Sequence, residues 1–277
     1  MTTHAGSAEG EPLRVLVSAG AAGIGASIVQ RFRADGARVS ICDRDKAAIS
    51  AAQERDPELH CLVGDVADMA DAQRWVGKVV ARWGGIDVLV NNAGVAGPTA
   101  RVEDVDPEDW RTCLAVNLDS HFYLARLVVP HLKAQRSGAI IAISSTAGLH
   151  GYGLRTPYAA SKWAVIGFTK SLAIELGPAG VRANVVAPGT VEGPRMTRVI
   201  AAEATRRGVR PEVVEQEYVA GQSIARYVQP SEIAEVCAFL ASPAASMVNG
   251  QVIAVDGHTE TFHITGRGVE GDEGPRP

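Results

Sequence analysis

Short apolar runs rich in β-branched residues alternate along this chain with longer segments whose apolar residues recur at helical spacing. Seven of these runs are candidate strands: Leu13–Val17, Arg38–Cys42, Leu59–Val63, Val88–Val90, Ala139–Ile143, Val181–Val186 and Val252–Val255. Such runs are typical of parallel strands buried on both faces, and helices between them supply the crossover connections. The pattern predicts an α/β fold: a doubly wound, seven-stranded parallel sheet with helices on both faces, in a single domain.

The alternation of strands and helices fills residues 13–262. Residues 1–12 and 263–277 are rich in Gly, Glu, Thr and Pro and have little to bury, so we expect flexible tails there. Within the domain, residues 194–229 separate the sixth strand from the last helix by more chain than a connection requires. We expect this segment to be a substrate lid.

Composition excludes several classes of partner. The chain has 277 residues, of which 46% are hydrophobic and 21% charged, with a net charge of -4. This balance gives no electrostatic footprint for nucleic acid or an anionic membrane, and favours a small-molecule ligand. The uncharged run at 236–255 contains turn signals and predicts helix, loop and strand instead of a membrane span. Because the amino terminus lacks a basic and apolar secretion signal, we expect a cytoplasmic protein.

The four cysteines, Cys42, Cys61, Cys113 and Cys237, lie far apart, without a C-x-x-C pair or a histidine at ligand spacing. They predict buried thiols in a reducing compartment and no metal site.

Candidate chemistry lies between Ser145 and Lys162. Ser145 follows the run Ala139–Ile143, at the carboxyl edge of the sheet where ligands collect in open α/β folds. Tyr158 and Lys162 are four residues apart and share one helix face. A nearby ammonium lowers the pKa of a phenol, so Tyr158 is a candidate acid/base, and the Ser145 hydroxyl can orient a substrate oxygen. Taken alone, such a Tyr–Lys pair more often indicates an exposed helix face.

A glycine-rich stretch, residues 18–25, links the first strand to a helix over Ala26–Ala34. Gly23 and Gly25 let the backbone approach a pyrophosphate at the helix amino terminus. Tight packing between strand and helix is the alternative explanation for such a turn.

Together, S-x12-Y-x3-K, the glycine-rich turn and N-N-A-G at 91–94 resemble the single-domain short-chain dehydrogenase/reductase family over Leu13–Gly257. The resemblance implies a Rossmann-type fold and hydride transfer with a nicotinamide cofactor. It implies that Tyr158 is the acid/base, that Ser145 orients the oxygen, and that Lys162 lowers the pKa of the tyrosine and binds the nicotinamide ribose. It also implies that Asn117 is a fourth catalytic residue, holding a water of a proton relay, although a lone buried Asn more often satisfies helix carbonyls.

The resemblance extends to cofactor contacts. It implies that the cofactor-binding residues are Ser18, Gly20, Gly23, Ile24, Gly25, Asp43, Arg44, Asp65, Val66, Asn92, Ala93, Gly94, Tyr158, Lys162, Pro188, Gly189 and Val191. For Asp43 the alternative is a solvated residue at the end of a strand, and for Asp65 and the asparagines it is a purely local turn role. The family pattern T-G-x-x-x-G-x-G is altered here, because Ser18 and Ala19 replace its Thr and first Gly. Either Ala19 is strained or Gly20 takes over the left-handed conformation. Gly193 stands where relatives often have Thr, which removes a hydroxyl contact to the cofactor phosphates.

Asp43 at the end of the second strand indicates the cofactor. Its carboxylate can accept hydrogen bonds from the adenosine ribose hydroxyls and repels a 2′-phosphate, which selects NAD. Ala22 stands where NADP-using relatives often have a basic residue, whereas Arg44 is able to pair with a phosphate. We predict NAD.

We therefore predict an NAD(H)-dependent oxidoreductase that acts on a secondary alcohol or ketone. The alternatives are a catalytically silent dinucleotide-binding sensor or scaffold, and a lyase or epimerase with bound NAD. Arg155 beside the catalytic segment predicts either contact with an anionic substrate or, more often for such a residue, a solvated surface position.

We also predict a homotetramer, as is common among relatives. The helical segments Pro107–Gln135 and Tyr158–Leu176 have more apolar residues than one face against a sheet needs. These are Leu114, Val116, Leu124, Val128, Val165, Ile166, Phe168 and Leu172.

Overall fold

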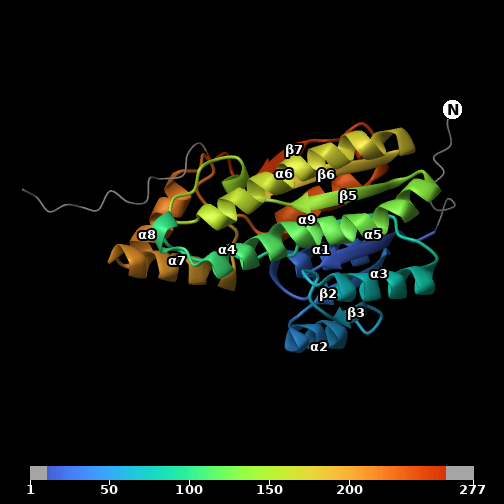
Figure 1. Cartoon of the computed structure of the whole chain (residues 1–277), viewed down its shortest axis with the longest axis horizontal. Helices are drawn as coiled ribbons and strands as arrows, with labels where there is room; N and C mark the ends of the chain where they lie inside the picture. The colour runs from blue at the N-terminus through green and yellow to red at the C-terminus, as the bar shows by residue number, and fades with distance from the viewer. Residues whose placement is uncertain (1–10, 260–277) are drawn as a thin grey trace, which may run out of the picture.

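Seven parallel strands form one twisted sheet at the centre of the molecule (Figure 1). The computed structural model describes residues 11–259, so most of both predicted tails lies outside the described residues. The strands are β1 (Arg14–Ser18), β2 (Arg38–Asp43), β3 (His60–Val63), β4 (Val88–Asn91), β5 (Gly138–Ile143), β6 (Val181–Pro188) and β7 (Val252–Val255). Their order across the sheet is β3-β2-β1-β4-β5-β6-β7. The predicted doubly wound parallel sheet is confirmed.

The sheet order places a switch point between β1 and β4. The chain moves outward from β1 to β2 and β3, then returns to pair β4 with the other side of β1, where Val15, Leu16 and Val17 face Val88, Leu89 and Val90. Ligands of such sheets bind outside the carboxyl ends of the strands at this reversal. Ser18 and Asn91 end the two adjoining strands, so both lie at the reversal.

Nine helices of eight residues or more are described in residues 11–259. They are α1 (Gly23–Ala34), α2 (Lys46–Arg55), α3 (Met69–Trp83), α4 (Pro107–Leu114), α5 (Ser120–Gln135), α6 (Thr156–Leu176), α7 (Pro194–Arg207), α8 (Pro211–Ala220) and α9 (Pro230–Ala241). Figure 1 shows α3, α5 and α6 beside the sheet, and α7 with α8 at one end of the molecule.

Alternating strand residues divide the core into two layers. Val15 and Val17 of β1 join the cluster made with α1 and α9, whereas Leu16 between them joins the cluster made with α3, α5 and α6. Side chains of a strand point alternately to its two faces, so both faces of β1 are covered by helices. This accounts for the continuous apolar runs in the sequence.

The helical stretch predicted over Pro107–Gln135 is present but is not uniform. Between α4 and α5, residues Ala115–Asp119 form a π-helical turn with Asn117 at its centre. Such turns bring an extra residue into the helix and are frequent at functional sites.

Five of the eight apolar residues behind the tetramer prediction, Leu124, Val128, Val165, Ile166 and Leu172, are buried inside this chain. The prediction that these five residues are left over for contacts between subunits was wrong, because α5 and α6 pack their side chains against the sheet and against each other. Different large apolar residues are exposed on the same helices: Trp110 on α4, Phe122 on α5, and Trp163 and Ile174 on α6.

Two further predictions concern thiols and membranes. Cys42, Cys113 and Cys237 are buried and unpaired, but Cys61 at the outer strand β3 is partly exposed, which corrects the expectation for that residue. Among residues 11–259 no group of His, Cys, Asp and Glu could hold a metal ion. In the same range, none of the helices has the length and apolar character needed to cross a membrane.

Candidate active site

The glycine-rich turn packs directly against the segment after β4. The Ser18 hydroxyl accepts hydrogen bonds from the backbone amides of Asn92 at 2.9 Å and Ala93 at 3.0 Å. In return, the Asn92 side chain donates to the carbonyls of Ser18 and Ala19, both at 3.0 Å. A Cβ on Gly25 would collide with the Ala19 carbonyl oxygen, so this position requires glycine. These hydrogen bonds, together with the glycine at position 25, hold the turn against the segment after β4 at the carboxyl edge of the sheet.

Ala19 itself adopts the left-handed conformation, with φ of 51°. The alternative, that Gly20 takes over this conformation, is wrong: Gly20 has no positive φ, and its lack of a Cβ instead avoids a collision with the Ile41 side chain. A non-glycine residue in this region is strained by about 1–2 kcal/mol. The Ala19 amide donates to the Cys42 carbonyl at 2.8 Å, which anchors the strained residue on β2.

The end of β2 turns a carboxylate toward the glycine-rich turn. Asp43 Oδ2 accepts from the Ala21 amide at 3.3 Å, and Oδ1 accepts from the Asp45 amide at 3.1 Å. Arg44 beside it is exposed and has no ion-pair partner in the described part of the chain. Beyond β3, Asp65 Oδ1 accepts from Ala67 at 2.9 Å, which is the local turn role that sequence reasoning left open.

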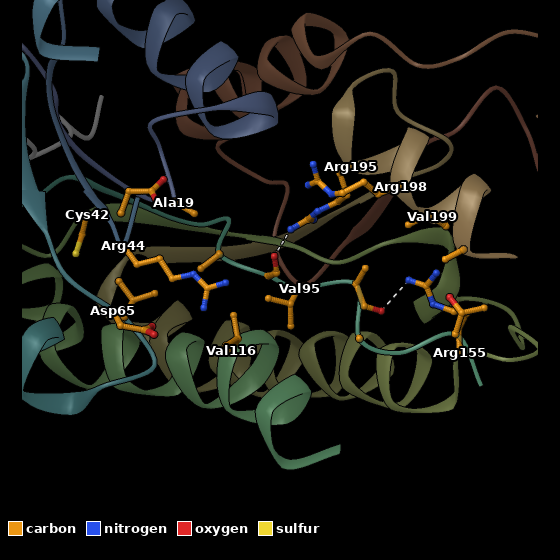
Figure 2. A pocket seen from close by; sticks show the side chains of 18 of the residues that line it. Ala19, Cys42, Arg44, Asp65, Val95, Val116, Arg155, Arg195, Arg198 and Val199 are labelled. Atoms are coloured by element: carbon orange, nitrogen blue, oxygen red, sulfur yellow. Dashed lines mark hydrogen bonds between the residues drawn. The ribbon is translucent and has the colours of Figure 1, made fainter. Parts of the chain in front are cut away.

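A pocket of about 430 Å³ runs along this edge of the sheet (Figure 2). It is lined by Ala19, Cys42, Asp43, Arg44, Gly64, Asp65, Val66, Ala93, Gly94, Val95, Ala96, Gly97, Thr99, Val116, Arg155, Arg195, Arg198, Val199 and Ala202. In Figure 2, Arg44 and Asp65 lie at one end, Val95 lies near the middle and Arg155 lies at the other end. Six of the predicted cofactor-binding positions, Asp43, Arg44, Asp65, Val66, Ala93 and Gly94, line this pocket.

Helix α6 places Tyr158 and Lys162 one turn apart, with Lys162 Nζ 5.8 Å from the centre of the Tyr158 ring. The Lys162 side chain is buried, and its Nζ donates to the Ile143 carbonyl at the end of β5 at 2.9 Å. Burial, and to a smaller extent the charge of Arg195, lowers the pKa of Lys162 to about 7. The ammonium is therefore held at the carboxyl end of the sheet, beside the phenol ring.

The two serines after β5 have different partners. Ser144 donates its hydroxyl proton to the Lys162 carbonyl at 2.8 Å, which ties α6 to the strand. Ser145 Oγ accepts from the Ala147 amide at 3.2 Å and caps a short 3₁₀ turn. Its hydroxyl proton remains available for another acceptor.

Asn117 links three segments of the site. Its Oδ1 accepts from the Val95 amide at 2.7 Å, and its Nδ2 donates to the Val95 carbonyl at 3.1 Å and to Ser161 Oγ at 2.9 Å. The alternative that Asn117 merely satisfies helix carbonyls is wrong. A Cβ added to Gly94 would lie 3.3 Å from Asn117 Oδ1 and 3.4 Å from Lys162 Nζ, so the lack of a side chain at this pocket-lining residue leaves space beside both.

The segment after β6 turns sharply because it passes close to the end of β7. The Gly189 amide donates to the Val255 carbonyl at 2.9 Å, and a Cβ at Gly189 would meet the Asp256 side chain at 2.7 Å. Val191 then bridges to Val228, which closes the base of the lid segment. The pocket lining does not include Pro188, Gly189 or Val191. Their contact with the cofactor therefore stays a prediction.

Two residues near the site, Arg195 and His121, were not predicted from the sequence to belong to it, and the environment predicted for a third, Arg155, differs in the structure. Arg195, at the start of α7, donates to the Gly94 carbonyl and lies over the pocket. Arg155 is buried, so the solvated surface position expected for it was wrong; its position three residues before Tyr158, on the same side of α6, was the available signal. His121 is fully buried, and its pKa is lowered to about 3, first by burial and then by Lys162.

The lid segment forms two helices with a small core of their own. Ile200, Ala204 and Val214 pack between α7 and α8. Tyr218 of α8 donates to the buried Glu203 carboxylate of α7 at 2.8 Å and contacts the Tyr152 hydroxyl, which belongs to the loop before Tyr158. Arg207 pairs with Glu203 at 3.0 Å. The lid is thereby connected to the loop that leads into the candidate catalytic helix.

Comparison with known proteins gives consistent matches over almost the whole described chain. A family model described as enoyl-(acyl carrier protein) reductase matches residues 19–258. A 3-oxoacyl-acyl-carrier-protein reductase of Thermotoga maritima is 36% identical over 246 residues, covering 87% of this chain and 95% of that protein. A trans-4-hydroxycyclohexanecarboxylate dehydrogenase of Sinomonas cyclohexanicum is 38% identical over 253 residues, covering 87% of this chain and 90% of that protein.

Solved structures agree with the fold described above. An actinorhodin polyketide ketoreductase with NADPH has a TM-score of 0.85 and 34% identity, covering 89% of this chain and 96% of that one. An NAD+-bound xylitol dehydrogenase has a TM-score of 0.84 and 28% identity, covering 89% of this chain and 98% of that one. These matches, with the sheet order, show that the chain belongs to the short-chain dehydrogenase/reductase family of oxidoreductases.

Proposed function

We propose that this chain is an NAD(H)-dependent oxidoreductase that transfers a hydride between nicotinamide and the carbon of a secondary alcohol or ketone. One observation supports the chemistry above all: the buried Lys162 ammonium, fixed on Ile143, lies beside the ring of Tyr158 at the carboxyl edge of the sheet. A positive charge there can stabilise the negative charge that develops on a tyrosine oxygen during proton exchange.

The residues at the sheet edge fit a dinucleotide. The turn over residues 18–25 offers close backbone approach at the amino terminus of α1, where a pyrophosphate is favoured, and Gly94 leaves space beside Asn117 and Lys162. Ser18, Gly20, Gly23, Ile24, Gly25, Asp43, Asp65, Val66, Asn92, Ala93, Gly94, Pro188, Gly189 and Val191 would hold the cofactor, which supplies hydride exchange when bound. The protein then supplies position and charge.

Each catalytic side chain has a distinct part in this proposal. Tyr158 exchanges the hydroxyl proton of the substrate, and Ser145 donates its free hydroxyl proton to the substrate oxygen. Lys162 stabilises the phenolate and contacts the nicotinamide ribose. Asn117 holds the backbone of Val95 against the π-helical turn and sustains the proton relay from Lys162.

Asp43 supports NAD over NADP. Its carboxylate ends β2 beside the glycine-rich turn and would face the adenosine ribose, where a 2′-phosphate is repelled. Arg44 supports the opposite choice, and the family includes structures with either cofactor. We favour NAD because Asp43 is held by two backbone amides, whereas Arg44 is exposed and unanchored.

The substrate, lid, assembly and location complete the proposal. Relatives named for acyl thioester and cyclic hydroxy acid substrates support a small secondary alcohol or ketone here. Residues 194–229 would close over it as a lid.

The exposed Phe122, Trp163 and Ile174 on neighbouring helices support a homotetramer. A cytoplasmic location is consistent with the four unpaired cysteines.

A spectrophotometric screen tests the function: secondary alcohols with NAD or NADP, and ketones with NADH or NADPH. The proposal predicts substrate-dependent appearance or loss of reduced nicotinamide, with NAD(H) preferred. A silent sensor would bind NADH without turnover, and a lyase or epimerase would convert its substrate with no net change in NADH. Either result would exclude the proposed reaction.

A further inference from the structure

The two ends of the pocket differ in charge. Among the residues that line it, the carboxylates are Asp43 and Asp65, at the end where Arg44 lies. Toward the opposite end, Arg195 and Arg198 lie above the middle of the pocket and Arg155 lies at its far end, and no further carboxylate lines it. Such a concentration of one sign of charge favours a ligand of the opposite sign.

Arg155 differs from the other two arginines because it is buried. It is 3% exposed, whereas Arg195 and Arg198 lie exposed on α7. A guanidinium has five N–H donors, and the hydrogen bond found for this side chain runs from Nη2 to the Ala96 carbonyl at 2.7 Å. Its Nε has no partner, and none of the carboxylates in residues 11–259 forms an ion pair with it.

Two partly buried arginines of the fold are better satisfied. Arg14 is paired with Asp87 at 2.8 Å, and Arg182 donates to three carbonyls at the end of α9. Removing a cation from water is unfavourable unless an anion or several acceptors replace the lost hydration. Arg155 has one acceptor and no anion, so this buried guanidinium has N–H donors left to bind a ligand.

The position of Arg155 connects this capacity to the proposed chemistry. Its Cζ lies 5.5 Å from the centre of the Tyr158 ring and 5.5 Å from that of Tyr152. The two rings and the Ala96 carbonyl fix the guanidinium at the amino-terminal end of α6, one turn from the candidate acid/base. An anion bound here would therefore lie within a few carbon atoms of a carbon reacting at Tyr158.

We propose that Arg155 binds a carboxylate of the substrate, and that the preferred substrates are small hydroxy acids and the corresponding keto acids. This inference rests on the proposed function. One buried guanidinium neutralises a monovalent anion, and its fork of N–H groups matches the two oxygens of a carboxylate. A phosphate would bring a second negative charge that the buried Arg155 does not balance.

The test compares acetoacetate, its methyl ester and dihydroxyacetone phosphate as substrates with NADH. Wild type should favour the acid over the ester in kcat/KM. Arg155→Gln should lower kcat/KM for the acid by about 10- to 100-fold and change the ester by less than about 3-fold. Arg155→Lys keeps the charge but lacks the two-pronged donor geometry, so its kcat/KM for the acid should lie between those of wild type and Arg155→Gln. Arg111→Gln is the matched control, because Arg111 pairs with Glu108 on the exposed face of α4.

Equal losses for acid and ester would overturn the proposal, because they indicate that Arg155 only braces Ala96. A wild-type preference for the ester or for the phosphate would also overturn it. NADH affinity, measured by fluorescence titration, should be unchanged in Arg155→Gln. A weakened NADH affinity would assign the guanidinium to the cofactor and also overturn the proposal. Arg155→Lys supplies the same comparison if Arg155→Gln does not fold.

Binding of butyrate, which cannot react, separates this proposal from the proposed function. Calorimetry with the NAD-saturated protein should give butyrate binding that is weakened about 10-fold or more by Arg155→Gln. If no ketone is reduced but this binding is found, the function is wrong and the carboxylate site stands. If ketones are reduced and Arg155→Gln leaves both butyrate binding and the acid-to-ester ratio unchanged, the function stands and this site is wrong.

Discussion

Lys162 Nζ lies 5.8 Å from the centre of the Tyr158 ring, one turn along the same helix. The lysine is buried, and its charge is stabilised by a carbonyl instead of a carboxylate. When Lys162 is protonated, its charge is therefore available to act on the phenol. The arrangement is paid for in folding stability, because a buried ammonium loses its hydration.

That cost predicts a pH dependence of stability. The pKa of Lys162 is lowered by burial from 10.5 to about 7. Between these values the unfolded chain binds a proton that the folded chain does not, so folding stability rises with pH through this window and the full penalty remains below pH 7. Relative to Lys162→Met, wild type should gain about 1–3 kcal/mol between pH 7 and 9. Urea unfolding of both proteins at one protein concentration measures this difference, and parallel curves would contradict it.

Cofactor choice should depend on Asp43. A 2′-phosphate placed against this carboxylate meets repulsion and displaces ribose hydrogen bonds, at about 2–4 kcal/mol, or roughly 30- to 1000-fold in affinity. Asp43→Ser removes the repulsion and leaves Arg44 free to pair with the phosphate, so the preference for NAD should shrink or invert. The measurement is kcat/KM with NAD and NADP on one substrate. A wild-type preference for NADP, or an unchanged ratio in the variant, would show that Arg44 decides instead.

The lid should become ordered on binding. Residues 194–229 are expected to exchange amide hydrogens faster in the free protein than with cofactor and substrate, because closure excludes water from hydride transfer. Tyr218→Phe removes a donor from the buried Glu203 and should speed this exchange and raise KM. Tyr227→Phe, whose hydroxyl bonds the exposed Glu215, is the matched control. Equal protection with and without ligands would argue against a lid.

Assembly should depend on the apolar side chains exposed on α5 and α6. Phe122 and Trp163 are 46% and 52% exposed, and covering them with a second copy would remove apolar surface from water. Light scattering at micromolar concentration should give a tetrameric mass. Combining Phe122→Asp with Trp163→Asp should reduce that mass, whereas Val102→Asp, at another exposed apolar residue, should not. A monomeric wild type would end this prediction.

Sequence patterns sufficed for the sheet because its strands are buried on both faces. The seven β-branched runs each appear as strands whose ends differ from the prediction by no more than two residues. The strand ends then place Ser18, Asp43, Asn91 and Ser145 at one edge, since parallel strands end on the same side.

The features of the site that could not be predicted from the sequence depend on contacts between distant segments. Arg155 is buried because the loop at Ala96 and the rings of Tyr152 and Tyr158 surround it, and none of these contacts follows from residue spacing. The left-handed Ala19 and the π-helical turn at Asn117 are backbone choices stabilised by tertiary hydrogen bonds to β2 and Val95. Local propensity does not encode them.

Tyr158→Phe tests the central claim most directly, because it removes the phenolic proton while keeping the ring beside Lys162 and Arg155. Steady-state turnover on a substrate found by the screen should fall by about 10²–10⁴-fold or more, and NADH binding, followed by fluorescence titration, should stay largely intact. Retention of more than about a tenth of kcat would show that Tyr158 is not the acid/base.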